Sequence, residues 1–219
     1  MLRRIAPLAL ILTLTATAPH RRTSPVLPPP PLPGPVDVAL TTELGTITLE
    51  LDVKHAPITA TNFVRYTEQK RFDGIVFYRA MHLPWGLPPN GLIQAGTRGD
   101  PQRLLPPITH EPTSLTGLHH QAGALSMARY APGTATGDFS ILISDMGGLD
   151  ADPAGKDAEA QAGYAVFGRV ISGMDVVSKI YDAPLAPTKG EGVMRGQMLA
   201  APVKVLTARR IAAPFSPSQ

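Results

Sequence analysis

The sequence predicts a mainly β domain, folded as a closed antiparallel barrel that is capped by two α-helices. Three observations support this prediction: many short apolar segments of strand character, turn signals between them, and only two stretches with a helical period. Closure into a barrel is one way in which an antiparallel sheet avoids exposed strand edges. The sequence shows no internal repeat and no second domain.

The strands follow from alternation and from short apolar runs. The first two form a hairpin, because apolar and polar residues alternate on both sides of Leu44-Gly45 in VDVALTTELGTITLELD. Further strands are expected at Gly74–Tyr78, Gly91–Ala95, Ala124–Ala128, Phe139–Ser144, Ala165–Ile171 and Pro202–Ala208.

The two helices are placed by a change of period. The first lies in HAPITATNFVRYTEQKRF, where Pro57 is compatible with a first helical turn. Its predicted apolar face consists of Ile58, Phe63, Val64 and Tyr66. The second helix is expected over Met174–Tyr181, where Val176, Val177 and Ile180 form an apolar stripe.

The first 18 residues predict an export signal. Arg3 and Arg4 precede an apolar segment, Leu8–Leu14, and the small residues of Ala16–Ala18 follow it. The apolar segment is too short to span a bilayer comfortably, so we expect cleavage, a periplasmic location and no integral membrane span in the mature chain. An uncleaved anchor and a buried helix are the alternatives.

The chain therefore divides into four parts. The signal peptide covers residues 1–18, a Pro-rich linker residues 19–35, the barrel domain residues 36–211, and a loose tail residues 212–219. The net charge of +3 gives no reason to expect nucleic acid as a partner. The chain has no cysteine, and its histidines at 110, 119 and 120 lack further ligands at useful spacing. We therefore expect surface or turn histidines and no metal.

Six segments, in this order, resemble the cyclophilin family of peptidyl-prolyl cis-trans isomerases. After the first hairpin they are APITATNFVRY, FDGIVFYRAM, LIQAG, GALSMARYAPGTATGDFSILI and YAVFGRVISGMDVVSKI. The resemblance covers most of the predicted domain. It implies an eight-stranded barrel with a surface groove for proline-containing polypeptides, and it requires no cofactor. We expect a monomer.

The resemblance assigns the catalytic roles to Arg79 and Gln94. In the family, the arginine after the Phe-Tyr pair donates to the substrate, and the glutamine of the IQ strand helps to hold the substrate backbone. Without the resemblance, Arg79 would be interpreted as a solvated arginine at a strand end and Gln94 as a polar residue on the outer face of the barrel.

Seven further residues are predicted to contact substrate: Trp85, Leu92, Ala128, Arg129, Asp138, Ser140 and Tyr164. Several of them depart from the family pattern. Gly91 and Ser140 stand where relatives have aromatic residues, Asp138 replaces a glutamine, and Tyr164 replaces a histidine. The segment between Arg79 and Gln94 is longer than is usual in the family. It carries Trp85, which either forms an apolar wall over the groove or packs the loop onto the barrel.

Two functional classes follow from these residues. The first is an exported prolyl isomerase that assists protein folding, which Arg79 and Gln94 favour. The second is a catalytically weak or inactive relative that binds peptides as a chaperone or scaffold, which Gly91, Asp138 and Ser140 favour.

Overall fold

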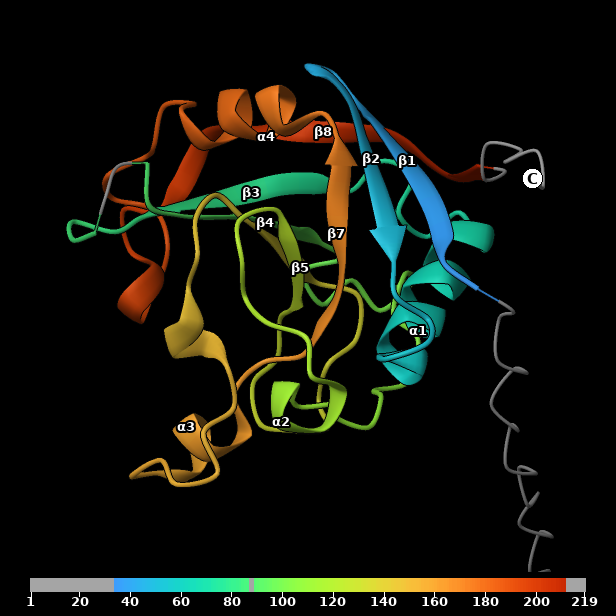
Figure 1. Ribbon diagram of the computed structural model, residues 1–219. Helices are drawn as coiled ribbons and strands as arrows, with labels where there is room; N and C mark the ends of the chain where they lie inside the picture. The colour runs from blue at the N-terminus through green and yellow to red at the C-terminus, as the bar shows by residue number, and fades with distance from the viewer. Residues whose placement is uncertain (1–33, 87–88, 212–219) are drawn as a thin grey trace, which may run out of the picture.

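The computed structural model describes residues 34–86 and 89–211, and eight strands in this part of the chain close into one barrel (Figure 1). The strand order is β1-β2-β7-β5-β6-β4-β3-β8, and every neighbouring pair is antiparallel. The bounds are β1 Val36–Thr42, β2 Gly45–Leu51, β3 Val76–His82, β4 Gly91–Gly96, β5 Ala124–Met127, β6 Phe139–Leu142, β7 Val166–Ser172 and β8 Met198–Ile211. The predicted fold class is confirmed. The predicted signal peptide, most of the linker and the tail lie outside the described residues.

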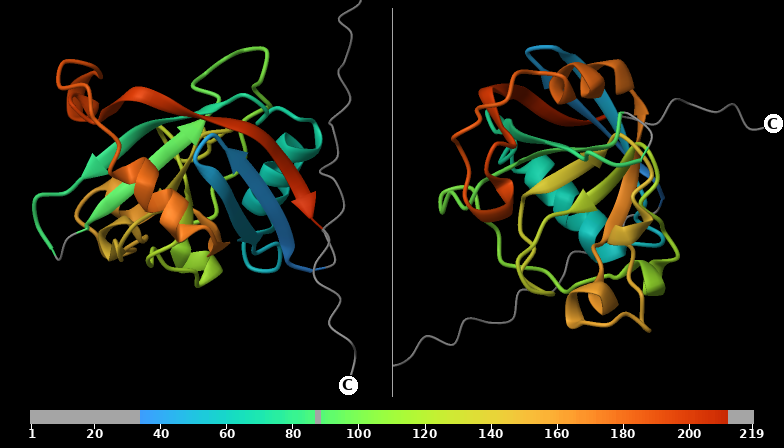
Figure 2. Two further views of the ribbon diagram at one scale, coloured as in Figure 1. Left: turned by 90° about the horizontal axis from the view of Figure 1, so that it is seen from above. Right: turned by 90° about the vertical axis from the view of Figure 1, so that its left-hand side faces the viewer.

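Two longer helices lie at opposite ends of the barrel, as Figures 1 and 2 show: α1 (Pro57–Glu68) and α4 (Met174–Tyr181). Four shorter helical segments were not predicted, because one turn is too short to show a period. They are α2 Thr113–Thr116, α3 Ala158–Ala162 and the 3₁₀ turns η1 Gly147–Leu149 and η2 Gly192–Met194. Among the described residues, no helix has the length and apolar character that a membrane crossing requires.

Aromatic rings fill the barrel where α1 packs against it. The ring of Phe63 on α1 lies 4.7 Å from that of Phe72, 5.0 Å from that of Phe139 and 5.4 Å from that of Phe167 (ring centroids). These four side chains are fully buried. Burial of rings of this size contributes roughly 1.5–3 kcal/mol each. The helix therefore closes one end of the barrel and holds β6 and β7 against it.

The prediction for Ile58 was wrong. Ile58 is 43% exposed, whereas Phe63, Val64 and Tyr66 are buried as predicted. Ile58 and Phe63 are five positions apart, and at 3.6 residues per turn this spacing points the two side chains in different directions.

Two strands differ from their predicted bounds in a way that matters for the site. The predicted strand Gly74–Tyr78 is β3, which continues to His82, so Arg79 lies within a strand and not at its end. The predicted strand Pro202–Ala208 is the middle of β8, which runs from Met198 to Ile211. The small residues Ala200 and Ala201 before Pro202 gave no alternating signal that would have revealed the start of the strand.

Candidate active site

A β-bulge in β3 determines where Arg79 points. Phe77 pairs with Ala95 of β4, but Arg79 and not Tyr78 pairs with the next residue, Gln94, so Tyr78 is the extra residue. Phe77 lies in the barrel core, while Tyr78 and Arg79 both contact side chains outside the core. A bulge of this kind reverses the alternation of a strand for one residue. It therefore allows two consecutive side chains to leave the barrel interior.

The guanidinium of Arg79 is held from two sides. Its Nη1 donates to Gln94 Oε1 at 2.8 Å, while Nε and Nη2 donate to Gln197 Oε1 at 2.9 and 2.6 Å. Nη2 also lies 3.4 Å from Met81 Sδ. Burial lowers the pKa of Arg79, which remains charged, because a guanidinium is not deprotonated in proteins. The structure thus presents a half-buried, oriented cation.

Arg79 stands at one end of a row of polar residues that crosses four strands. Gln94 of β4 pairs with Ser140 of β6, and Ser140 pairs with Ser126 of β5. We call Arg79, Gln94, Ser140 and Ser126 the polar row. The residues that flank the last three all belong to the hydrophobic core, so the row faces away from the interior. Its three smaller members are 4–8% exposed. Two of them have hydrogen-bond partners, since Gln94 accepts from Arg79 and Ser126 Oγ lies 2.9 Å from His120 Nε2.

The side chains of Arg129 and Tyr164 form a unit beside the row. The Arg129 guanidinium lies over the Tyr164 ring at 4.4 Å from the centroid, and it donates to Glu159 Oε2 at 3.0 Å and to the Gly163 carbonyl. The Arg129 side chain is 1% exposed. It is therefore turned toward α3 and not toward a ligand, so only the backbone of Arg129 remains for the predicted substrate contact. Its visible effect is to hold Tyr164.

Asp138 is committed to protein partners. Its carboxylate accepts the Tyr78 hydroxyl at 3.2 Å, the Thr97 hydroxyl at 3.2 Å and the Arg98 backbone N–H at 3.1 Å. Burial raises the pKa of Asp138, and these hydrogen bonds only partly oppose that effect. Asp138 therefore fixes Tyr78, the bulged residue, and the start of the segment after β4.

The remaining predicted contacts lie in different settings. Leu92, on β4, is 6% exposed. Ala128 directly follows β5, and its N–H donates to the Asp138 carbonyl at 3.0 Å. Trp85 lies in the loop between β3 and β4 and is 65% exposed.

The backbone explains why glycine occupies position 91. The φ of Gly91 is +148°, and a Cβ there would lie 1.8 Å from the Met81 carbonyl oxygen. An aromatic residue does not fit at this position with this backbone.

His120 corrects the expectation of surface or turn histidines, because it is 1% exposed. Its Nδ1 lies 2.5 Å from Asp150 Oδ1 and its Nε2 lies 2.9 Å from Ser126 Oγ. His119 Nδ1 also reaches Asp150, at 2.8 Å. Burial lowers the pKa of His120, and Asp150 opposes this effect. A carboxylate oxygen only accepts, so Nδ1 donates to Asp150. This network ties the loop before β5 to the polar row. No group of three potential metal ligands occurs in residues 34–86 and 89–211.

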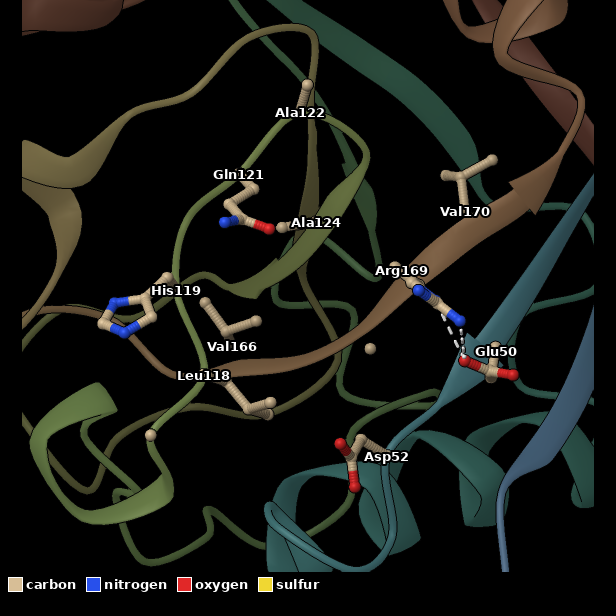
Figure 3. Close-up of a pocket in the computed structure, with 12 residues that line it drawn as sticks. Glu50, Asp52, Leu118, His119, Gln121, Ala122, Ala124, Val166, Arg169 and Val170 are labelled. Atoms are coloured by element: carbon tan, nitrogen blue, oxygen red, sulfur yellow. Dashed lines mark hydrogen bonds and ion pairs between the residues drawn. The ribbon is translucent and has the colours of Figure 1, made fainter.

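A separate hollow of about 650 Å³ lies on the outside of β2, β5 and β7 (Figure 3). Figure 3 shows Arg169 reaching toward Glu50, to which it donates at 3.0 Å, with His119 and Leu118 on the other side. The hollow is lined by residues of β2, β5, β7 and segment 117–122, and the predicted site residues are not among them. It is therefore distinct from the polar row.

Sequence reasoning identified Arg79 and Gln94 as a pair, but it missed Gln197 and Met81 as partners of the same guanidinium. Gln197 is 118 residues from Arg79 in the chain and lies between the second predicted helix and the last predicted strand, where no helix or strand was predicted. Register between β3 and β8 brings it there, since Arg79 pairs with Met198. No local sequence signal carries this information.

Comparisons with known proteins agree with the fold. The family described as cyclophilin-type peptidyl-prolyl cis-trans isomerase matches residues 37–208. A peptidyl-prolyl cis-trans isomerase of Acinetobacter baylyi is 37% identical over 174 residues, which are 78% of this chain and 82% of that protein. Peptidyl-prolyl cis-trans isomerase A of Dickeya dadantii is 34% identical over 147 residues, 65% of this chain and 70% of that protein.

A solved structure supports the same fold. A cyclophilin-type isomerase of Cryptosporidium parvum, crystallised in the presence of the dipeptide Ala-Pro, has a TM-score of 0.63 at 17% identity. The match covers 81% of this chain and 99% of that one. The chain belongs to the cyclophilin-type peptidyl-prolyl cis-trans isomerases, as its sequence predicted, and it is an isomerase of that class.

Proposed function

We propose that this protein catalyses cis-trans isomerisation of X-Pro bonds in exported proteins and that Arg79 is the catalytic donor, assisted by Gln94. The observation that carries the proposal is the guanidinium held against the polar row by Gln94 and Gln197. A cation fixed in this way offers a donor at one defined place. Such a donor is what rotation about an imide bond needs.

The chemistry requires no covalent intermediate. Conjugation between nitrogen and carbonyl gives an X-Pro bond a rotation barrier of about 18–20 kcal/mol. In the twisted state the nitrogen becomes pyramidal and regains a lone pair, which can accept a hydrogen bond that the planar imide cannot. A donor aimed at that nitrogen therefore stabilises the twisted state selectively.

Gln94 has a group left for the substrate. Its Oε1 accepts from Arg79, and its Nε2 has no hydrogen-bond partner among the described residues. That amide nitrogen is also not one of the fully buried polar atoms without a partner. It is therefore available to a carbonyl of the substrate backbone, so that one side chain both holds the cation and positions the peptide.

The test is an isomerisation assay on a short X-Pro peptide with wild type, Arg79→Ala and Arg79→Lys. We expect kcat/KM to fall about 100-fold in Arg79→Ala, which corresponds to roughly 2–4 kcal/mol for one charged donor in a partly dry site. Arg79→Lys keeps the charge but lacks the planar array of donors, so it should recover little of the loss. Glu50, which pairs with Arg169 at the separate hollow, provides a control in Glu50→Gln. Equal rates for wild type and Arg79→Ala would refute the catalytic role.

The exported location rests on the first 18 residues, with their basic start, apolar segment and small residues. We propose cleavage near Ala18, release as a monomer and action in the periplasm. N-terminal sequencing of protein from a periplasmic extract tests this. A mature chain that starts within residues 17–23 supports the proposal, and an uncleaved chain in the membrane fraction contradicts it.

A second function has one observation in its favour. Ser140, in the middle of the polar row, has a hydroxyl where relatives have an aromatic ring. A peptide-binding chaperone tolerates the loss of this ring more readily than an enzyme that must bind a proline ring. Peptide binding without acceleration of isomerisation in the wild type would favour this alternative.

A further inference from the structure

Gln197 is the main partner of the Arg79 guanidinium. Its Oε1 accepts from both Nε, at 2.9 Å, and Nη2, at 2.6 Å, so one oxygen fixes one edge of the planar group. Gln94 binds a different nitrogen, Nη1. The two glutamines lie on opposite neighbours of β3, since Gln94 is on β4 and Gln197 directly precedes β8. The Arg79 guanidinium is thus hydrogen-bonded from both sides of β3.

The contacts leave few donors free. A guanidinium has five N–H bonds. Gln197 accepts two of them and Gln94 accepts one. The fourth is the second N–H of Nη2, which faces Met81 Sδ at 3.4 Å. Among the described residues the fifth, on Nη1, has no partner. The arrangement therefore selects a single N–H that can turn to a ligand.

The Gln197 amide is itself oriented. Its Nε2 donates to the Val193 carbonyl at 2.8 Å, so its oxygen must face the other way, toward Arg79. Its backbone is fixed as well, because its carbonyl accepts from Ala80 N at 3.0 Å and its N–H donates to the Met194 carbonyl at 3.1 Å. Figure 1 shows this loop, with η2, beside the far end of β3. The loop before β8 therefore fixes the orientation in which Gln197 accepts from Arg79.

We propose that Gln197 is a positioning residue for isomerisation: it locks the Arg79 guanidinium so that one Nη1 N–H points at the substrate imide. This inference rests on the proposed function of Arg79. Within the protein, the oxygen of Gln197 binds Arg79 and one of its two amide N–H bonds donates to the Val193 carbonyl. It acts through Arg79, and without it the cation stays charged but gains rotational freedom.

The alternative is that Gln197 only anchors its loop through Val193. Two substitutions of similar size separate these roles. Gln197→Met removes both the acceptor and the donor, whereas Gln197→Glu keeps the acceptor for Arg79 and loses the donor to Val193. Gln161→Met is the matched control, because Gln161 Nε2 also donates to a loop carbonyl, that of Gly155 at 2.9 Å, far from Arg79 in the chain.

The first readout is the rate on an X-Pro peptide. We expect Gln197→Met to lower kcat about tenfold with little change in KM, because an oriented donor acts in the transition state. Gln197→Glu should stay within about threefold of wild type, and Gln161→Met should equal it. In an Arg79→Ala background, Gln197→Met should have no further effect. A loss in Gln197→Glu equal to that in Gln197→Met, or a tenfold loss in the Arg79→Ala background, would overturn the proposal.

The second readout does not depend on activity. The Nε–H signal of Arg79 in a ¹H–¹⁵N spectrum, assigned by its absence in Arg79→Lys, should exchange slowly with water in the wild type and at least about fivefold faster in Gln197→Met. If the wild type shows no isomerase activity, the proposed function fails and this signal alone decides the positioning. Unchanged exchange in Gln197→Met would show that Gln197 does not hold Arg79.

Discussion

At the scale of single residues, the decisive feature is that contacts with other residues of the protein orient the charged side chains of the site. Arg79 donates to two glutamines, whereas Arg129 donates to Glu159 and to the Gly163 carbonyl while its guanidinium lies over the Tyr164 ring. The sequence alone predicted Arg79 and Gln94 through family resemblance. It did not predict that the Arg129 side chain points away from the row, because the direction depends on α3 and Gly163, which contact it only in the folded chain.

Asp138 yields a prediction about pH. Burial raises the pKa of Asp138 in the folded chain above its ordinary value, so folding favours the protonated acid. The stability that this preference provides is present below the unfolded-state pKa and is lost as pH rises through the folded-state pKa. Asp138→Asn is neutral at every pH. We therefore expect the free energy of unfolding of the variant, relative to wild type, to rise between about pH 4 and pH 7.

Urea unfolding of both proteins across this pH range measures the difference. Its slope with pH, and not its absolute value, is the test, since the substitution also changes the bond to Thr97. Asp145→Asn serves as the control, because Asp145 is a surface carboxylate that accepts one backbone N–H from Ala122. A difference that stays flat, or that falls with pH, would contradict a raised pKa.

At the scale of elements, the bulge in β3 and the loop that follows it shape the site. The apolar run before Arg79 predicted a strand but not its bulge, since an extra residue leaves no mark in the composition of a short run. The strand bounds show the same limit: the hairpin at Leu44-Gly45 alternates clearly and was predicted, while the irregular start of β8 was missed. The alternation of apolar and polar residues shows which face of a strand is buried. Bulges and other irregular backbone depend on pairing with neighbouring strands, which the sequence of one strand does not show.

The loop between β3 and β4 carries a prediction for Trp85. Because its side chain is 65% exposed, Trp85→Ala should leave the free energy of unfolding within about 0.5 kcal/mol of wild type. If Trp85 forms the apolar wall over a bound peptide, the same change removes part of the area that the peptide covers. We expect affinity for an X-Pro peptide to fall about fivefold.

Titration of the peptide with wild type, Trp85→Ala and Leu115→Ala tests this. Leu115, in α2, is a comparably exposed apolar residue at 74% and should have no effect on binding. Unchanged affinity in Trp85→Ala, with an intact fold, would reject the wall and leave Trp85 as a residue of the loop surface.

At the scale of the whole molecule, barrel closure brings the site together. The members of the polar row and Gln197 come from five strands or their ends, and they become neighbours only because β3 lies between β4 and β8 and β6 lies between β4 and β5. The fold class and the two longer helices could be predicted from periodicity, since the aromatic core leaves a strong apolar pattern. The contacts across the row could not, because they depend on register.

The central claim is that the Arg79 guanidinium speeds rotation of the bound imide and does not merely bind the peptide. Exchange spectroscopy by NMR on an X-Pro peptide at saturating enzyme measures this rotation directly, apart from affinity. The account predicts cis-trans exchange of the bound peptide that is about 100-fold slower in Arg79→Ala than in wild type. Equal exchange rates in the two saturated complexes would contradict it.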